Sequence, residues 1–411
     1  MQMPRFGDWQ ILLVKKHMLW LTRGAVERMN RKATLTSVLI IVLVLASLFV
    51  AVKFVGENQL PKFFVGVEFA YAIDNATGIA GLVSDLKGLV DEVKNCTNLF
   101  VIGTPQISLN QAALNESCDY IYNAGLHFIV LFTDRTQYAQ DPFVWTLKAR
   151  EKYGDMFLGV YRIDEPGGKQ LDNDTEKFVL EAKNYPDAAS NYVKYVSIHL
   201  DDWIYASSNQ VFTSDYGLYW FDYKGGYATL FTEFGFNLSR QIQVGLCRGA
   251  AQAQNKDWGA IVTWTYDNAP YIESAQELYS DLVLAYEAGA KYAVVFDYPK
   301  TGPYGILTQE HLDAMRNFWT YMQANPQSHG ANQGNVAYVL PKDYGFGFRN
   351  PQDNIWGLWN ADELAPKVWS DVNQLTAQYG SRLDIVYDDP AFADAFSGRY
   401  KKLFFWNQTI S

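Results

Sequence analysis

The chain has 411 residues, of which 49% are apolar and 16% aromatic, and its net charge is −10. This apolar share supplies a substantial core and excludes a globally disordered chain. The length exceeds one average domain and suits a large α/β barrel with an addition. After residue 52 the chain holds 27 basic and 42 acidic side chains, a negative excess that argues against nucleic acid as a partner.

The N-terminal part contains an apolar run, ATLTSVLIIVLVLASLFVAV at residues 33–52, with no charge over twenty residues. Such a run is long enough to cross a bilayer as a helix. Residues 1–32 carry seven Lys or Arg against two acids. The positive-inside rule therefore predicts a cytoplasmic basic segment (1–32), a transmembrane helix (33–55) and an extracytoplasmic remainder (56–411), as in a single-pass type II membrane protein.

Three alternatives to an uncleaved membrane anchor remain for this apolar run. The first is a cleaved secretory signal, although the apolar run is long for such a signal and the basic segment before it is extended. The run also resembles an archaeal pilin-type signal, because Arg31 and Lys32 precede Ala33; cleavage there leaves the apolar helix on the mature protein. In the third alternative, residues 34–55 form a core helix of a soluble protein.

Glycosylation sequons and cysteines fit an extracytoplasmic chain. Six Asn-x-Ser/Thr sequons follow the apolar run, at Asn75, Asn95, Asn115, Asn173, Asn237 and Asn407, which predicts a glycoprotein. Cys96 and Cys118 lie near each other in sequence, and an oxidising compartment allows a disulfide between them. Cys247 is then a leftover buried thiol.

From residue 62 onward, strand-like and helix-like segments alternate. In chain order, the patterns predict strand 63–71, helix 81–94, strand 98–103, helix 110–125, strand 127–134, helix 143–154, strand 156–165, a helical region 174–208, strand 216–223, helix 239–254, strand 258–267, helix 274–290, strand 291–299, helix 308–326 and strand 335–341. Nearly continuous apolar strands bracketed by helices indicate a parallel sheet covered on both faces. Seven or eight such units predict a (β/α)₈ TIM barrel over residues 56–334.

The tail, residues 335–411, adds a predicted helix (363–379) and two strands (383–389 and 402–407). It is either the last barrel unit with an extension or a small C-terminal α/β domain.

Carboxylates and aromatics gather where the predicted strands end, which is where parallel barrels place their active sites. Asp favours turns and helix N-termini, so some acids are expected there. Glu does not, and it is depleted from strands. The predicted site residues are Glu68, Asp134, Asp164, Glu165, Trp220, Asp222, Trp264, Tyr266, Asp267, Asp297 and Tyr298, with Glu233 as a further acid lining the cleft.

The segment Ile163-Asp164-Glu165-Pro166 resembles the Asn-Glu-Pro motif that ends strand four in the clan A glycoside hydrolases, with Asp164 in place of the Asn. In that superfamily the Glu is the acid/base and a Glu ending strand seven is the nucleophile. The resemblance covers about residues 62–330. It implies that Glu165 is the proton donor and that Asp297, one methylene shorter than the usual Glu, is the nucleophile or a base activating water. The tail resembles the α/β domains that follow some β-galactosidase-type barrels.

These observations lead to two hypotheses. The first is a membrane-anchored extracytoplasmic glycoside hydrolase that cleaves glycosidic bonds with two carboxylates, or one that lyses or transfers glycans on the same barrel. The second is a non-catalytic glycan-binding or cell-envelope structural barrel. In either case carbohydrate is the expected ligand, since surplus aromatics suit sugar clefts as well as cores. An alternative interpretation of Asp164 and Glu165 is an acid pair that caps the next helix. The five histidines are scattered without a metal-binding spacing, so no metal or other cofactor is expected.

Overall fold

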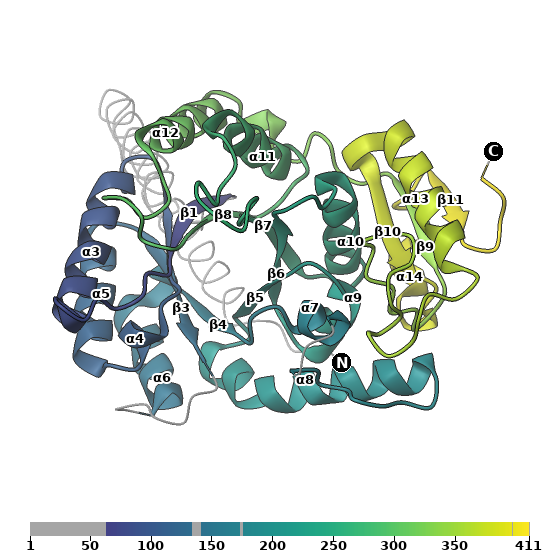
Figure 1. Cartoon of the computed structure of the whole chain (residues 1–411), viewed down its shortest axis with the longest axis horizontal. Coiled ribbons are helices and arrows are strands. Elements are labelled where there is room, and N and C mark those ends of the chain that lie inside the picture. Colours follow the sequence, from purple (N-terminus) through teal and green to yellow (C-terminus); the bar gives the residue numbers. More distant parts are fainter. Residues whose placement is uncertain (1–62, 134–140, 173–175, 397, 411) are drawn as a thin grey trace, which may run out of the picture. The chain divides into compact units, whose positions relative to one another are not determined.

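The structure is a computed structural model that describes residues 63–133, 141–172, 176–396 and 398–410. Eight parallel strands form a closed barrel in sequential order (Figure 1). They are β1 (Phe64–Phe69), β2 (Leu99–Ile102), β3 (His127–Phe132), β4 (Phe157–Arg162), β5 (Val211–Asp215), β6 (Thr229–Phe234), β7 (Asp257–Val262) and β8 (Tyr292–Asp297). The predicted (β/α)₈ barrel is confirmed.

Helices surround the barrel and follow most of its strands (Figure 1). They are α3 (Gly78–Val93), α4 (Pro105–Ser108), α5 (Gln111–Asn123), α6 (Pro142–Tyr153), α7 (Pro166–Leu171), α8 (Tyr185–Ser207), α9 (Tyr219–Gly225), α10 (Arg240–Ala253), α11 (Ala275–Glu287) and α12 (Gln309–Ala324). Single 3₁₀ turns lie at Gly154–Met156, Pro326–Ser328, Gly380–Arg382 and Pro390–Phe392.

The barrel closes through β1 and β8, which pair from Phe64 opposite Tyr292 to Phe69 opposite Asp297. Its interior is filled by side chains rather than open. The stacked rings of Phe64 and Tyr292, with centroids 5.1 Å apart, form part of this filling. A packed interior of this kind makes a floor, so a ligand site has to lie at the strand ends.

The strand count differs from the prediction in the middle of the chain. The aromatic segment 216–223, expected as strand five, lies mostly in helix α9. The real fifth and sixth strands, VFTSD and TLFTEF, are short and mix apolar with polar residues, and the patterns above did not identify them. Apolar periodicity cannot distinguish short buried strands from short buried helices, and here tertiary burial decided both.

The expected eighth barrel strand at 335–341 belongs to another sheet. Strand β9 (Val336–Leu340) lies between β10 (Leu383–Tyr387) and β11 (Lys402–Phe405) in a three-stranded parallel sheet. Helices α13 (Ala365–Tyr379) and α14 (Ala393–Phe396) accompany it, and the layer lies beside α10 (Figure 1). Residues 335–411 therefore form a small α/β layer, and the barrel closes without them.

The predicted transmembrane helix at 33–55 lies outside the described residues. Within the described ranges, none of the helices combines the length and apolar character that a bilayer crossing needs. The predicted Cys96–Cys118 disulfide is wrong: Cys96, Cys118 and Cys247 are all free and buried. Burial raises the pKa of each thiol, which keeps them in the unreactive protonated form.

Candidate active site

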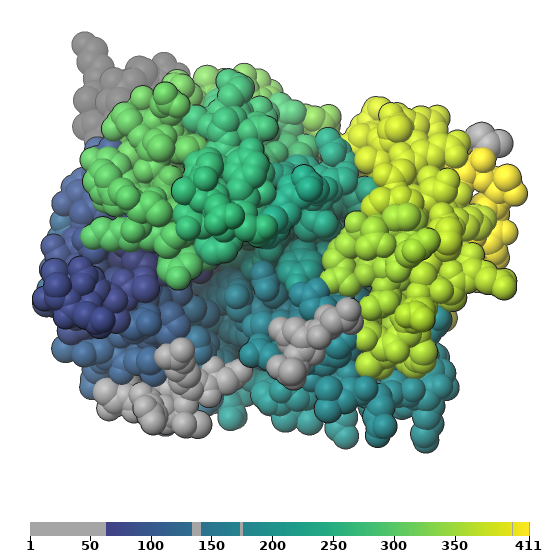
Figure 2. Space-filling model, in the orientation of Figure 1, coloured from purple at the N-terminus to yellow at the C-terminus, as the bar shows by residue number. Residues whose placement is uncertain are grey.

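A cavity of about 1010 Å³ lies at the carboxyl ends of the barrel strands. Figure 2 shows this face of the molecule hollowed near its centre. Residues at the ends of β1, β3, β4, β5, β6, β7 and β8 contribute to its wall. Of the predicted site residues, the structure brings six to this cavity: Glu68, Asp164, Glu165, Glu233, Trp264 and Tyr298.

The turn after β4 has an unusual backbone. Ile163 has φ +50° and Glu165 has φ +49°, and neither is a glycine. A β-branched residue with positive φ is a genuine outlier, and conformations of this kind cost about 1–3 kcal/mol each. The surrounding structure must therefore hold Asp164 and Glu165 in place.

Contacts from β5 hold this turn. The Asp215 carboxylate accepts hydrogen bonds from the backbone N–H groups of Gly167, at 2.5 Å, and Gly168, at 2.8 Å. The N–H of Glu165 donates to the Ser214 carbonyl at 3.2 Å. These bonds fix the start of α7 against the end of β5, so Asp215 positions Glu165.

The two glycines allow this close packing. A Cβ at position 167 would lie 2.4 Å from the carbonyl oxygen of Gly217, and one at position 168 would lie 2.2 Å from the Tyr216 ring. Real Cβ atoms do not come so close to backbone atoms. The Pro-Gly-Gly segment after Glu165 is therefore set by the packing of α7 on β5. Glu165 does not act simply as a helix cap, because its side chain makes no capping hydrogen bond to α7.

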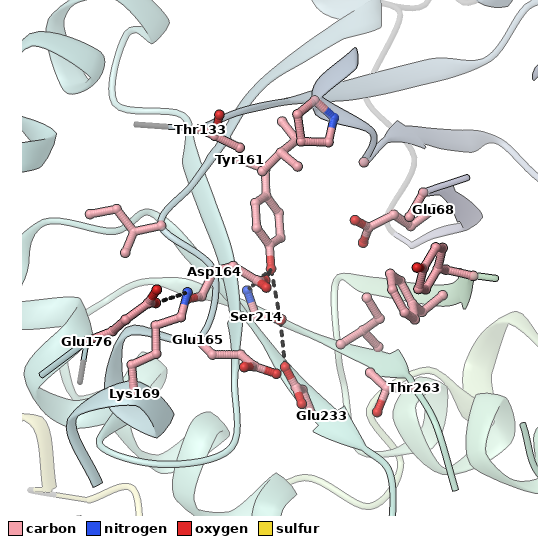
Figure 3. A pocket seen from close by; sticks show the side chains of 18 of the residues that line it. Glu68, Thr133, Tyr161, Asp164, Glu165, Lys169, Glu176, Ser214, Glu233 and Thr263 are labelled. Carbon is pink, nitrogen blue, oxygen red and sulfur yellow. Dashed lines mark hydrogen bonds and ion pairs between the residues drawn. The ribbon is translucent and has the colours of Figure 1, made fainter. Parts of the chain in front are cut away.

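The Glu165 and Glu233 carboxyl groups approach each other from β4 and β6 and point toward one another in Figure 3. Burial, followed by the negative charges of Asp164 and Asp215, raises the pKa of Glu165 to about 8. Burial and the Glu165 charge also raise the pKa of Glu233 well above its usual range. Two like charges this close cannot both ionise easily, so at least one of the two carboxyl groups holds its proton at neutral pH.

A chain of hydroxyl groups connects this pair to Asp164. The Ser214 hydroxyl donates to Glu233 Oε1 at 2.7 Å. The Tyr161 hydroxyl lies 2.5 Å from Asp164 Oδ1 and 2.8 Å from the Ser214 oxygen, and it accepts the Ser214 N–H at 2.9 Å (Figure 3). The network orients Asp164 and Glu233 toward one space.

Aromatic rings line the cavity on more than one side. Trp264 and Tyr298 stack nearly parallel, with centroids 6.0 Å apart, and Trp264 Nε1–H donates to the Tyr298 carbonyl at 2.6 Å. Phe178 and Tyr195 stack with centroids 4.5 Å apart. Phe236 is 48% exposed. Flat apolar faces of this kind suit the faces of sugar rings.

Asp297 is not where the resemblance implied. It ends β8 rather than the seventh strand, it is fully buried, and it is not among the residues lining the cavity. Its Oδ2 accepts the Tyr71 hydroxyl at 2.6 Å, and its Oδ1 accepts the Ile306 N–H at 2.9 Å. Asp297 thus holds the loop around Ile306 against the barrel, and the predicted pairing with Glu165 across the cavity is wrong.

Other predicted residues also lie away from the cavity lining. Trp220 and Asp222 are in α9, because the expected strand there does not exist. Trp220 packs on Tyr387, with centroids 5.2 Å apart, and Asp222 accepts the Tyr192 hydroxyl at 2.5 Å. Tyr266 and Asp267 are exposed beyond the end of β7. Asp134 lies outside the described residues.

Three residues of this site were not identified from the sequence: Tyr161, Ser214 and Asp215. Tyr161 lies inside β4, where it looked like an ordinary strand aromatic. Ser214 and Asp215 end β5, a strand that the patterns missed. The run Thr-Ser-Asp after two apolar residues was the available signal, since polar residues mark strand ends in barrels. Among the described residues, no group of three His, Cys, Asp or Glu side chains could hold a metal ion.

Comparisons with known proteins agree on the fold. No protein-family model matches the chain, and a search of curated proteins gives no match. Among solved structures, the chain is similar to α-L-fucosidase isoenzyme 2 from Paenibacillus thiaminolyticus, with 9% identity, 83% of this chain and 59% of that chain covered, and a TM-score of 0.50. The chain thus spans 59% of the length of that structure.

Two further structures match with lower scores. They are the endo-1,4-β-mannanase from Eisenia fetida (10% identity, 63% of this chain and 91% of that chain, TM-score 0.43) and tryptophan synthase of Mycobacterium tuberculosis (10%, 64% and 92%, TM-score 0.33). At 9% identity the similarity to the fucosidase is one of fold, and barrels of one fold carry out many reactions. The function has to be argued from the site itself.

Proposed function

We propose that this protein is a glycoside hydrolase that cleaves glycosidic bonds with a pair of carboxyl groups, Glu165 and Glu233. The approach of these two carboxyl groups from β4 and β6, in a cavity with aromatic walls, is the observation that carries the proposal. Hydrolysis of a glycosidic bond needs one protonated carboxyl and one carboxylate on the same substrate. A pair in which one member holds its proton while the other is ionised would supply both.

In this proposal Glu165 is the general acid. Its carboxyl gives the proton to the glycosidic oxygen as the bond to the anomeric carbon breaks. Burial favours the protonated form of such a group until the moment of transfer. Glu233 is the second carboxylate, which either attacks the anomeric carbon or takes a proton from the attacking water. Asp215 and Ser214 keep the two groups oriented.

The spacing of the pair would decide the stereochemical outcome. Retaining enzymes separate the two carboxyl groups by about 5–5.5 Å and inverting ones by about 6.5–9.5 Å. The separation of the two carboxyl groups in a complex with bound sugar therefore distinguishes the two possible roles of Glu233.

The test is a pair of isosteric variants assayed with a panel of oligosaccharides. We expect Glu165→Gln to lower turnover by about 10²–10⁴-fold, because Gln has no proton to give, while oligosaccharide binding and the unfolding temperature remain. Glu233→Gln should lose turnover as well. Glu116→Gln, an exposed carboxyl paired with Lys87, is the matched control. Unchanged turnover in Glu165→Gln would refute the assignment.

A second candidate is a glycan-binding barrel without catalysis. One observation favours it: β7 ends at Val262 and is followed by Thr263, where the clan A pattern has its nucleophilic Glu. This candidate predicts that oligosaccharides bind to the cavity, that no glycosidic bond is cleaved, and that Glu165→Gln changes only the affinity.

We further infer that residues 33–55 anchor the chain in a membrane and that the barrel lies on the outer side. The support is the sequence pattern together with the exposure of four sequon asparagines: Asn75, Asn95, Asn237 and Asn407. Asn115 is half-buried, and its Oδ1 accepts the Trp145 indole N–H at 2.8 Å, so we expect it to be unmodified.

Protease treatment of intact cells followed by peptide mass spectrometry tests this topology. We expect barrel peptides to be released, with glycans on some of the four exposed asparagines in a host that makes them. Complete protection of the barrel in intact cells, with cleavage after lysis, would place it on the inner side.

A further inference from the structure

Glu68 lies in the cavity wall without a partner. It is in β1, its exposed fraction is 6%, and it lines the same cavity as Glu165. Among the described residues, no hydrogen bond or ion pair reaches its carboxyl group, although most of the other acids in the site have one. Burying a carboxyl without a partner is costly. A bound group that donates hydrogen bonds would remove this cost.

The position of Glu68 is set by its neighbours. A Cβ on Gly103 would lie 2.2 Å from Glu68 Oε1, so only glycine leaves room there. Packing against Gly103 closes one side of the carboxyl group, and Figure 3 shows it pointing into the cavity from the side opposite Glu165 and Glu233. Asp164, which is exposed, adds a second negative charge close enough to act on Glu68.

The charge of the cavity selects against anions. Its described lining holds five carboxyl groups, Glu68, Asp164, Glu165, Glu176 and Glu233, and no Arg or His. Two lysines also line it: Lys169 donates to the Asp164 carbonyl at 2.7 Å and lies 3.9 Å from Glu176, and Lys177 donates to the Gly357 carbonyl at 2.5 Å. Acids therefore outnumber lysines by five to two in this lining. A uronate or sulfated sugar would meet repulsion here, whereas a cation would meet attraction.

We propose that Glu68 and Asp164 form a subsite for the ammonium group of an amino sugar, beside the Glu165–Glu233 pair. This inference rests on the proposed glycoside hydrolase function and names its substrate class. An ammonium group carries three donors and a full charge, so it can pair with the ionised Glu68 while the charge of Asp164 adds to the attraction. A sugar hydroxyl carries one donor and no charge, and an acetylated amine has one N–H and no charge.

The protonation of Glu68 gives this subsite a measurable signature. Burial, followed by the charge of Asp164, raises the pKa of Glu68 to about 8, so the empty cavity holds this group protonated at neutral pH. A cation favours the ionised carboxylate and drives the proton off. Binding of an amino sugar should therefore release a proton to the buffer, and binding of a neutral sugar should not.

The experiment is calorimetric titration of the full chain in detergent with glucosamine, N-acetylglucosamine and glucose oligomers of equal length and linkage. It is run at mildly acidic pH in two buffers of different ionisation enthalpy. We expect the glucosamine oligomer to bind at least tenfold more tightly than the other two and to release close to one proton. Glu68→Gln should abolish the preference and the proton release. The matched control Glu116→Gln, which removes an exposed carboxyl outside the cavity, should keep both.

Equal affinity for the three oligomers, tighter binding of the acetylated one, no binding of the glucosamine oligomer, or an unchanged preference in Glu68→Gln would each overturn the subsite. Turnover is measured in parallel. If the amino sugar binds with proton release and is not cleaved, the subsite stands and the hydrolase function fails. If a neutral glycan is cleaved and the amino sugar is not preferred, the function stands and the subsite fails.

Discussion

Two buried carboxyl groups of this site, through their raised pKa values, affect the stability of the folded chain. Glu68 and Glu165 both have a pKa near 8, in each case mainly because burial disfavours the charged form. Such groups are tolerated while they carry protons. They weaken the folded state when they ionise, because the unfolded chain keeps the same charge fully hydrated. Carboxyl groups of this kind gather at functional sites more often than elsewhere.

The pH dependence of stability tests this cost at Glu68. The folded pKa is raised from 4.5 to about 8, so the contribution of the bound proton is complete below about pH 4.5 and is lost as the pH rises through 8. Glu68→Gln removes this loss because Gln stays neutral. We expect its unfolding temperature to exceed that of the wild type by ~3 °C or more at pH 8.5, and by less at pH 5. Thermal unfolding followed by circular dichroism measures this, with Glu116→Gln as the control. An equal difference at both pH values would contradict the assignment.

At the scale of elements, the β4–α7 turn and the end of β5 form one unit. The strained residues Ile163 and Glu165 are held by the Asp215 carboxylate, by the Ser214 carbonyl and by Thr213, whose hydroxyl donates to the Ile163 carbonyl at 2.6 Å. Strain that is held by so many contacts places side chains more exactly than a relaxed loop can, which is what a catalytic acid requires.

The glycine after Pro166 tests this unit. Gly167→Ala would place a Cβ 2.4 Å from the Gly217 carbonyl oxygen. The clash is with backbone, which cannot easily move away. We expect a loss of about 1–3 kcal/mol in the free energy of unfolding and at least a tenfold loss of turnover, because the turn moves Glu165. Gly88→Ala is the control: Gly88 is an exposed position of α3 with open space around it, so Ala should stabilise by about 0.5–1 kcal/mol. Denaturant unfolding and turnover assays distinguish the two variants. Wild-type turnover in Gly167→Ala would refute the role of the turn.

At the scale of the whole molecule, a buried ion pair joins the barrel to the C-terminal layer. Arg248 of α10 and Asp384 of β10 are both fully buried, with Arg248 Nε 2.7 Å from Asp384 Oδ1. The guanidinium also donates to the carbonyls of Ala288 and Asn332, at 3.3 and 3.1 Å, and to that of Leu383 at 3.3 Å. Arg248 thus connects α10, the segment after α11 and the second sheet through one side chain.

Removal of one partner tests this connection. Arg248→Met should lower the free energy of unfolding by about 3–5 kcal/mol, because Asp384 is then a buried charge without a countercharge, bonded only to the Tyr400 hydroxyl among the described residues. The double variant Arg248→Met/Asp384→Leu should recover part of this loss, since neither charge remains. Denaturant unfolding of the two variants measures the difference. If the single variant unfolds like the wild type, the pair does not hold the two layers together.

Several features could be predicted from local chemistry. The strand and helix periods predicted a closed parallel barrel, and Glu165 in its Asp-Glu-Pro-Gly-Gly setting was predicted as the central acid. Glu68, Asp164, Glu233, Trp264 and Tyr298 were predicted as its neighbours, and the structure brings them to the cavity. Their position at the cavity could be anticipated because carboxyl ends of barrel strands meet at one face; their roles in a reaction stay predictions.

The sequence by itself determined the barrel, its acid-rich mouth and the motif that carries Glu165, because each depends on residues close together in the chain. Only the tertiary structure decided which carboxyl group meets Glu165. Two unrecognised strands, β5 and β6, shifted the count, so Asp297 proved to be a buried loop anchor on β8, and Glu233 on β6 is the carboxyl group that faces Glu165. The reason is geometric: whether a strand-end side chain faces the cavity or a neighbouring loop depends on barrel order and on packing against residues distant in sequence, which local patterns do not encode.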